Sequence, residues 1–237
     1  MSLLSKLTII IPTFYPGKII IKCLRSLPKK SEIIIVDNGD DIELKNIIKS
    51  LKLNIRYFNI GDVGLPKSFN YAVNKAKNEN ILITQPDVYF EKNSVINLVK
   101  AQKKYTKVGI ISPLLFEKKK YSQYDYLDLS LSKLGTLENK RRPKKISMFP
   151  SGDICVEAVN ATAMLVKKSI IKKINGWDEN IYTYHEDIDL CLRLRKKGYS
   201  IMKIKKSIAH HVGFGSNKKK NREKIDKSRN WHFCWSS

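Results

Sequence analysis

Acidic side chains stand at three places where a predicted strand ends or a predicted helix begins. Asp37 follows the apolar run 32–36, and Asp87 follows the run 81–84. Three carboxylates fall within four residues in Glu186-Asp187-Ile188-Asp189. Carboxylates placed in this way can bind a divalent cation or take a proton from a substrate hydroxyl.

The start of a helix explains part of the third group without any chemistry. Carboxylates in a first helical turn interact favourably with the free amide groups and with the helix dipole. Asp189 and Arg193 are also four residues apart, which suits a surface ion pair. Capping accounts for one of the three carboxylates, so the other two are candidates for chemistry.

Two adjacent histidines, His210 and His211, follow the last predicted strand and precede Gly213. Along an extended chain, neighbouring side chains point to opposite sides. One imidazole can therefore face a site while the other packs or faces water. At the end of a strand and beside a glycine-rich turn, an imidazole is suited to contact a metal or a phosphate.

Short strands and helices alternate over the first half of the chain. The predicted strands cover 7–11, 32–36, 55–60, 81–84 and 108–111, and the predicted helices cover 18–27, 41–51, 65–77 and 93–104. Short, wholly apolar runs bounded by turn residues are typical of strands covered on both faces. Their alternation with helices predicts an α/β fold with a doubly wound, mostly parallel sheet. Ligands of such sheets bind at the carboxyl ends of the strands, where Asp37 and Asp87 stand.

The second half has a weaker pattern. Residues 117–150 carry many Lys, Arg and Tyr side chains and no clear periodicity, so we expect a basic, partly mobile excursion there. Regular structure is predicted again from 154 onward, with strands at 161–166 and 199–204 and helices at 169–174 and 186–197.

Composition excludes several classes of protein. With 237 residues and 42% hydrophobic residues, the chain is long and apolar enough to bury a core. No apolar run approaches the roughly 18 residues that a transmembrane helix needs. The four cysteines lie far apart, which fits reduced thiols of a cytoplasmic protein better than a zinc or disulfide framework. The glycines at 61 and 64 do not form a dinucleotide-binding or P-loop motif.

The net charge of +23 predicts attraction to polyanions such as nucleic acid, an anionic membrane or a diphosphate. Of the 45 basic residues, 37 are Lys and only 8 are Arg. Arg is the side chain preferred for base edges and bidentate phosphate contacts, so this balance disfavours nucleic acid. A general preference for Lys also explains part of the charge.

Taken together, the motifs resemble family 2 glycosyltransferases of the GT-A fold, from about residue 7 to 216. The resemblance rests on Thr8-Ile9-Ile10-Ile11-Pro12-Thr13, Ile34-Ile35-Val36-Asp37-Asn38, Gly64 with Asn70, Gln85-Pro86-Asp87-Val88, Asn175-Gly176-Trp177-Asp178-Glu179, the segment 186–193 and His210-His211-Val212-Gly213. The Gln-Pro-Asp-Val form is most similar to the rhamnosyltransferase-like branch.

The resemblance implies roles for particular residues. Asp187, with Glu186 beside it, matches the general base. Asp87 matches the last carboxylate of a D-x-D element that holds Mg²⁺ or Mn²⁺, and His210 matches the histidine that helps to hold the metal, with His211 as the alternative. The substrate-binding positions are Pro12, Thr13, Asp37, Asn38, Gly64, Asn70, Asp87, Trp177 and Asp178. Gln85 replaces the first carboxylate of the D-x-D element, so we expect weak metal binding, or binding that depends on the phosphates of the nucleotide.

The implied activity is inverting transfer of a sugar, rhamnose or another hexose, from a nucleoside-diphosphate sugar to a glycan acceptor in cell-surface polysaccharide synthesis. Residues 1–216 would form one catalytic domain, with a nucleotide-sugar half (7–115) and an acceptor half (116–216). The Lys-rich and aromatic tail, 217–237, suggests a truncated extension. We expect a cytoplasmic enzyme with a lipid-linked glycan acceptor and peripheral contact with the anionic inner face of the membrane.

Two other functions remain open from the sequence. The charge alone would suit a nucleic-acid-binding protein, although no nucleic-acid motif is present. A sugar-binding module without activity is the other alternative, and the Glu186-Asp187 pair argues mildly against it.

Overall fold

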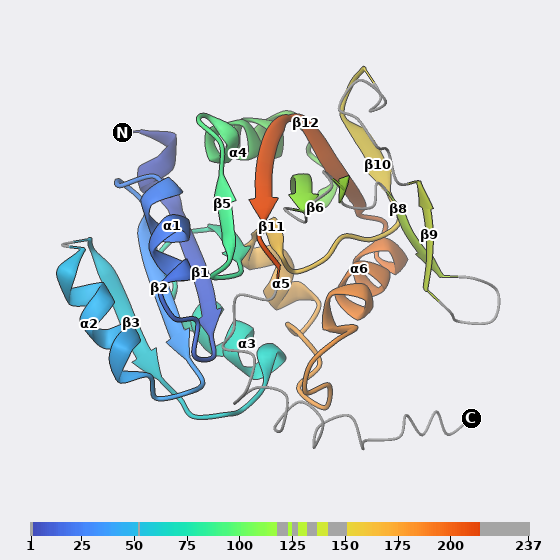
Figure 1. Cartoon of the computed structure of the whole chain (residues 1–237). Helices are drawn as coiled ribbons and strands as arrows, with labels where there is room; N and C mark the ends of the chain where they lie inside the picture. Colours follow the sequence, from blue (N-terminus) through green and yellow to red (C-terminus); the bar gives the residue numbers. More distant parts are fainter. Residues whose placement is uncertain are drawn as a thin grey trace.

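A mixed β-sheet forms the centre of the molecule (Figure 1). The computed structural model describes residues 2–51, 53–117, 123–124, 128–131, 137–141 and 151–213. Within these residues ten strands make one sheet, whose main order is β10-β12-β6-β11-β4-β1-β2-β3, with β5 paired to β12 and β7 paired to β6. The strands are β1 (Leu7–Thr13), β2 (Glu32–Asp37), β3 (Ile55–Asn59), β4 (Asn80–Thr84), β5 (Val88–Phe90), β6 (Val108–Glu117), β7 (Gln123–Tyr124), β10 (Ile154–Val156), β11 (Ala163–Lys167) and β12 (Ser200–His211).

Most of the central pairings are parallel, as the sequence predicts. Strands β3, β2, β1 and β4 are parallel neighbours, and β12 is parallel to β6. The exception is β11, which lies antiparallel between β4 and β6. Because β11 is buried on both faces like the parallel strands of this sheet, its apolar run does not reveal its direction.

Helices cover both faces of the sheet and give it two cores. Side chains of α1, α2 and α4 pack on one face with Ile9, Ile35 and Leu82, and side chains of α3, α5 and α6 pack on the other with Ile10, Ile34 and Ile83. This is the doubly wound α/β arrangement that the alternating pattern predicts. The helices are α1 (Ile19–Ser26), α2 (Ile42–Ser50), α3 (Leu65–Lys75), α4 (Ser94–Lys104), α5 (Lys168–Lys173) and α6 (Glu186–Lys196), preceded by a 3₁₀ turn (Leu3–Lys6).

The prediction of regular structure was most incomplete at four strands. β6 continues to Glu117, beyond the predicted end at 111. β12 continues to His211, well beyond the predicted end at 204, because its later residues pair with β5 and with the second half of β6. Lysines at 203, 205 and 206 interrupt the apolar pattern that would have revealed this length. The short strands β5 and β10 were not predicted.

No elements were predicted in the segment 117–150, and its described residues contain three short strands. They are β7 (Gln123–Tyr124), which continues the main sheet, and the ladder of β8 (Asp128–Leu131) with β9 (Leu137–Arg141). The predicted tail, 217–237, lies outside the described residues. Among the helices that the structure describes, none has the length and apolar character to cross a bilayer.

Candidate functional site

The carboxyl ends of β1 and β2 bring Thr13 and Asp37 side by side, since these two residues are register partners. Asp37 is fully buried, and its carboxylate accepts hydrogen bonds from the backbone amides of Gly39 (2.9 Å) and Asp41 (2.8 Å). It also accepts from the Tyr57 hydroxyl at 2.6 Å and from the Thr13 hydroxyl at 3.4 Å. Both oxygens of Asp37 are thus engaged in shaping the turn that follows β2.

Asn38 belongs to the same corner of the site. Its side-chain oxygen accepts a hydrogen bond from the Ser68 hydroxyl at 2.8 Å, and its side-chain amide donates to the Thr13 carbonyl at 3.4 Å. These contacts fix the end of β1 against the first turn of α3. Pro12 is buried within β1 beside Val36, its register partner.

Gly64 directly precedes α3, at a point where another segment lies close to the backbone. Its φ is +85°, and a Cβ atom there would lie 2.5 Å from the Tyr182 carbonyl oxygen. That carbonyl accepts the Leu65 amide at 3.0 Å, and the Tyr182 hydroxyl donates to Asp62. A glycine is therefore required at 64, because the loop before α6 lies directly on this helix start.

Asn70 and Trp177 form a clamp between α3 and the turn after α5. The Asn70 side chain accepts from the Trp177 amide and donates to the Trp177 carbonyl, each at 2.9 Å. The Trp177 ring is 1% exposed, packs on Phe69, and has a buried Nε1 with no hydrogen-bond partner among the described residues. Asp178 is exposed, and its Oδ1 accepts from Asn180. The sequence predicted substrate contact for all three of Asn70, Trp177 and Asp178, and here Trp177 lies inside the core.

Asp87 follows β4 and lies beside His211, not His210. The Asp87 carboxylate is 3.2 Å from His211 Nε2. His210 points the other way, with Nε2 2.8 Å from Glu91 and its ring stacked on Tyr89. Both histidines lie on β12 where it pairs with β5, so alternation along the strand sends them to opposite sides. The structure thus brings Asp87 together with the alternative histidine of the sequence prediction.

A carboxylate oxygen and an imidazole nitrogen are ligand types that suit Mg²⁺ or Mn²⁺. Within the described part of the chain, however, no three His, Cys, Asp or Glu side chains gather in a way that could hold a metal ion. Asp87 and His211 fit a divalent cation only as a pair, with the other coordination positions left for oxygen atoms of a substrate or of water.

The Asp187 carboxylate is held at the start of α6. Its two oxygens accept the backbone amides of Ala161 at 3.0 Å and Ile188 at 2.8 Å. Burial raises the pKa of Asp187 above its ordinary value, although these amides oppose the rise. The neighbouring Glu186 is 4% exposed, and its Oε2 has no hydrogen-bond partner in the described structure. Burial first, and then the charge of Asp187, raise the pKa of Glu186 to about 7.

The short segment Ala161-Thr162 joins the two acidic parts of the site. Ala161 donates its amide to Asp187, while the Thr162 carbonyl accepts the Gln85 amide at 3.2 Å and the Thr84 hydroxyl at 3.1 Å. Gln85 begins the turn that carries Asp87. Two consecutive residues therefore hold the Asp187 carboxylate against the end of β4. No local pattern in the sequence could have predicted this connection.

Arg193 does more than the predicted surface pairing. It forms the expected ion pair with Asp189 at 2.6 Å, and the same guanidinium donates to the carbonyls of Ile174 and Gly176 at 2.8 Å each. It thereby fixes the turn before Trp177 on α6. The four-residue spacing from Asp189 was the only signal in the sequence, and it did not reveal this second role.

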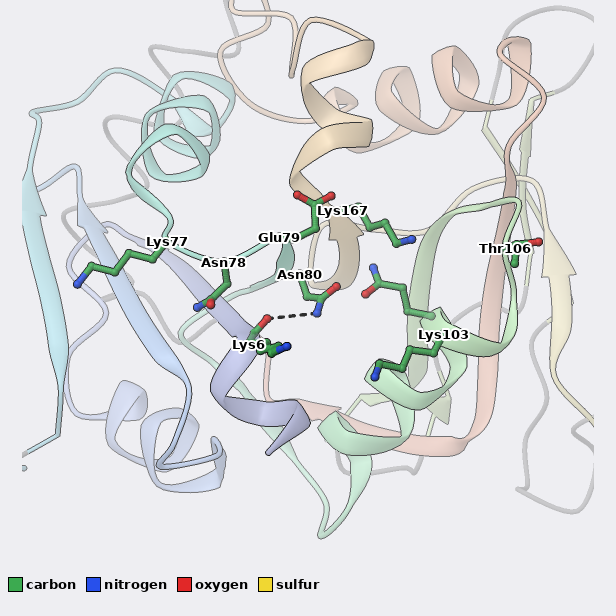
Figure 2. Close-up of a pocket in the computed structure, with 9 residues that line it drawn as sticks. Lys6, Lys77, Asn78, Glu79, Asn80, Lys103, Thr106 and Lys167 are labelled. Carbon is green, nitrogen blue, oxygen red and sulfur yellow. Dashed lines mark hydrogen bonds between the residues drawn. The ribbon is translucent and has the colours of Figure 1, made fainter. Parts of the chain in front are cut away.

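A basic hollow of about 670 Å³ lies at the amino ends of the parallel strands, opposite to the ends that carry Asp37 and Asp87 (Figure 2). Its lining includes Lys6, just before β1, Asn80, the first residue of β4, and Lys167, the last residue of the antiparallel β11. These positions mark the amino ends of the parallel strands, whereas Asp37 and Asp87 stand at the carboxyl ends. None of the candidate residues described above lines this hollow.

Comparison with known proteins finds similarity to glycosyltransferases. Residues 8–171 match the family model described as "Glycosyl transferase family 2". The chain is 28% identical to the rhamnosyltransferase WbbL of Escherichia coli (strain K12) over 220 residues, which cover 85% of this chain and 78% of that protein.

Two solved structures have a similar fold. One is GalNAc-T7 with UDP, GalNAc and Mn²⁺ (TM-score 0.72, 14% identity, 87% of this chain and 44% of that chain). The other is the mannosyltransferase PcManGT from Pyrobaculum calidifontis in complex with GDP-Man and Mn²⁺ (TM-score 0.63, 13% identity, 89% of this chain and 58% of that chain). The chain spans less than two thirds of either of these longer chains.

Proposed function

Because this chain belongs to glycosyl transferase family 2, we propose that it transfers a hexose from a nucleoside-diphosphate sugar to a glycan acceptor with inversion at the anomeric carbon. The predicted family, GT-A fold and glycosyltransferase class are confirmed. Rhamnose is the first donor sugar to test, because the chain is similar to a rhamnosyltransferase over most of its length. Residues 1–216 are proposed as the single catalytic domain.

The observation that carries the proposal is the placement of Asp187. Its carboxylate is fixed by two backbone amides and tied through Ala161-Thr162 to the turn that bears Asp87. A proton-accepting group thus lies beside the edge of the sheet where α/β proteins bind nucleotides. The raised pKa makes Asp187 a better proton acceptor than an ordinary aspartate.

In the proposed reaction, Asp187 takes the proton from an acceptor hydroxyl while that oxygen attacks the anomeric carbon. The new bond forms between this oxygen and the anomeric carbon, and the bond from that carbon to the phosphate oxygen breaks. Attack from the face opposite to the leaving nucleoside diphosphate inverts the configuration. The tight turns at Asp37 and Gly64 support a nucleotide site at the ends of β1 and β2.

Asp87 and His211 are proposed to hold Mg²⁺ or Mn²⁺, which would stabilise the negative charge that develops on the diphosphate. The Mn²⁺ named for two structures of similar fold supports this choice of metal class. Gln85 contributes no carboxylate, so metal binding should depend strongly on the phosphates of the donor.

The acceptor is proposed to be a lipid-linked glycan at the cytoplasmic face of the membrane. The net charge of +23 supports peripheral contact with anionic lipid, and we expect no nucleic acid partner. Co-sedimentation with liposomes of neutral and of anionic lipid tests the contact. Binding that does not depend on anionic lipid would argue against it.

The activity is tested by screening dTDP-, UDP- and GDP-sugars for transfer to glycosides, followed by Asp187→Asn. The variant should lose at least about a hundredfold in turnover while nucleotide binding, measured by calorimetry, stays nearly unchanged. Glu43→Gln is the matched control, because Glu43 is an exposed carboxylate in the first turn of α2. Turnover by Asp187→Asn close to that of the wild type would refute the role of this residue.

A further inference from the structure

The loop before α6 carries an exposed aromatic ring three residues before Asp187. Tyr184 is 57% exposed, compared with 44% for Tyr182. The two tyrosines differ in their contacts, since the Tyr182 hydroxyl is bound to Asp62. Among the residues that the structure describes, no hydrogen bond or ring contact joins the Tyr184 ring to another group. Its aromatic face is therefore available to a ligand.

The backbone that presents this ring is strained. Tyr184 has a φ of +65° and His185 a φ of +68°, and neither is glycine. Left-handed backbone is unfavourable for side chains of this size, and two such residues in succession persist only where their surroundings hold them. Strain of this kind at non-glycine residues is concentrated at functional sites.

Contacts on both sides hold the strained pair in place. Before it, the Tyr182 carbonyl accepts the Leu65 amide at 3.0 Å. After it, the His185 carbonyl accepts the Asp189 amide at 2.9 Å in the first turn of α6. The Tyr184 backbone also interacts with the Glu186 carboxyl, which places the end of this loop against the acidic pair. The backbone at Tyr184 is thus held next to Glu186 and Asp187.

The other aromatic residue expected near the sugar does not reach the surface. Trp177 is 1% exposed and packed on Phe69, so its ring has no free face for a saccharide. Tyr184, by contrast, is exposed and stands two residues before Glu186 in the chain.

We infer that the Tyr184 ring is the surface on which the acceptor saccharide stacks, with its attacking hydroxyl directed toward Asp187; this rests on the proposed function. A pyranose ring has a face of C–H groups that gains from contact with an aromatic face, while its hydroxyls remain free for water and polar groups. A tyrosine side chain has only two torsion angles, so its ring loses little conformational freedom when the sugar binds.

The experiment removes the ring and keeps the backbone conformation. Asn is among the side chains that best tolerate left-handed backbone, so Tyr184→Asn deletes the aromatic face without adding strain. Tyr184→Phe keeps the face and removes only the hydroxyl. Ile42→Ala is the control for an exposed apolar side chain, since Ile42 is 72% exposed on α2. The acceptor probes are para-nitrophenyl hexopyranosides, with the nucleotide-sugar that the wild type turns over.

Tyr184→Asn should raise the KM for the acceptor about tenfold and change kcat less than about threefold. The donor KM, and nucleotide affinity by calorimetry on the same preparation, should stay within about twofold. Tyr184→Phe should keep the acceptor KM near the wild-type value, and Ile42→Ala should leave kcat and both KM values unchanged. A normal acceptor KM in Tyr184→Phe, beside a raised one in Tyr184→Asn, would show that the ring face binds the acceptor.

An unchanged acceptor KM in Tyr184→Asn, or a Phe variant as impaired as the Asn variant, would overturn the inference. An equal rise in donor KM would do the same, because it would place the ring on the donor side. Failure of the proposed function would give a different result. If the proposed function is wrong, the wild type transfers no sugar from any nucleotide-sugar of the screen.

Discussion

Asn70 and Trp177, 107 residues apart, exchange two hydrogen bonds of 2.9 Å. The Asn70 side chain satisfies both the amide and the carbonyl of Trp177, and Gly176 fits here because a Cβ atom would lie 2.4 Å from Asn70 Oδ1. One side chain thereby joins α3 to the turn that leads to α6.

Asn70→Ala should lower the free energy of unfolding by about 2–4 kcal/mol, since two backbone groups near a buried tryptophan lose their partner. Urea denaturation measures the effect. Asn74→Ala is the matched control, because Asn74 lies exposed one turn later on α3 and its side chain makes no hydrogen bond to any residue that the structure describes. A loss below about 0.5 kcal/mol for Asn70→Ala would mean that the clamp contributes little.

Much of the first half of the fold could be predicted, because each apolar run there is short, buried and ended by Pro, Gly or Asp. β1, β2 and β4 were placed within about two residues for this reason. β12 was underestimated because its continuation depends on pairing with β5 and β6, and pairing between distant segments leaves no local pattern. The direction of β11 was hidden in the same way.

In the functional site, too, some residues could be identified from the sequence while their spatial relationships could not. Asp37, Asp87 and Asp187 could be identified because a carboxylate at the end of a strand or the start of a helix is visible in the sequence. Whether His210 or His211 faces Asp87 depends on the register of β12 on β5, which the sequence does not reveal. Exposure was equally hidden, since a tryptophan in a glycine turn can lie at the surface or in the core.

Asp37 should prove to be essential for the local fold. Asp37→Asn replaces an acceptor of four hydrogen bonds with an amide whose NH₂ faces backbone donors, so the free energy of unfolding should fall by about 2–4 kcal/mol. Tyr57→Phe removes one of those bonds and should cost about 1.5 kcal/mol.

Asp40→Asn provides the comparison for Asp37, and urea denaturation is again the measurement. Asp40 is exposed, makes a surface ion pair with Lys45, and has a φ of +50° that asparagine tolerates. Its substitution should change stability by less than about 0.5 kcal/mol. Equal effects at 37 and 40 would contradict the buried network at Asp37.

Glu186 should make the protein less stable as the pH rises toward neutral. Its pKa is about 7 in the folded chain and 4.5 as an ordinary glutamate, so the folded state binds the proton more tightly between these values. Stability from this group is therefore greatest below about pH 4.5 and is lost as the pH passes through 7. The shift corresponds to about 3 kcal/mol.

Glu186→Gln tests this dependence, because glutamine stays neutral at every pH. The difference in unfolding free energy between Glu186→Gln and the wild type should grow in favour of the variant from pH 4.5 to pH 8, by up to about 3 kcal/mol. Glu43→Gln should follow the wild type. A difference that stays constant over this range would exclude a proton held by Glu186.

The metal response should depend on His211 more than on His210. His211 Nε2 faces the Asp87 carboxylate at 3.2 Å, whereas His210 is occupied by Glu91 and Tyr89 on the other side of β12. Titration calorimetry of a nucleoside diphosphate with and without Mn²⁺ gives the strengthening of binding that the metal causes.

His211→Ala and Asp87→Ala should each reduce that strengthening about tenfold or more, because loss of one of two protein ligands leaves the cation held mainly by phosphate. His210→Ala should retain most of it, since this imidazole does not point toward Asp87. If His210→Ala abolishes the metal response and His211→Ala does not, then Asp87 and His211 do not hold the metal as proposed.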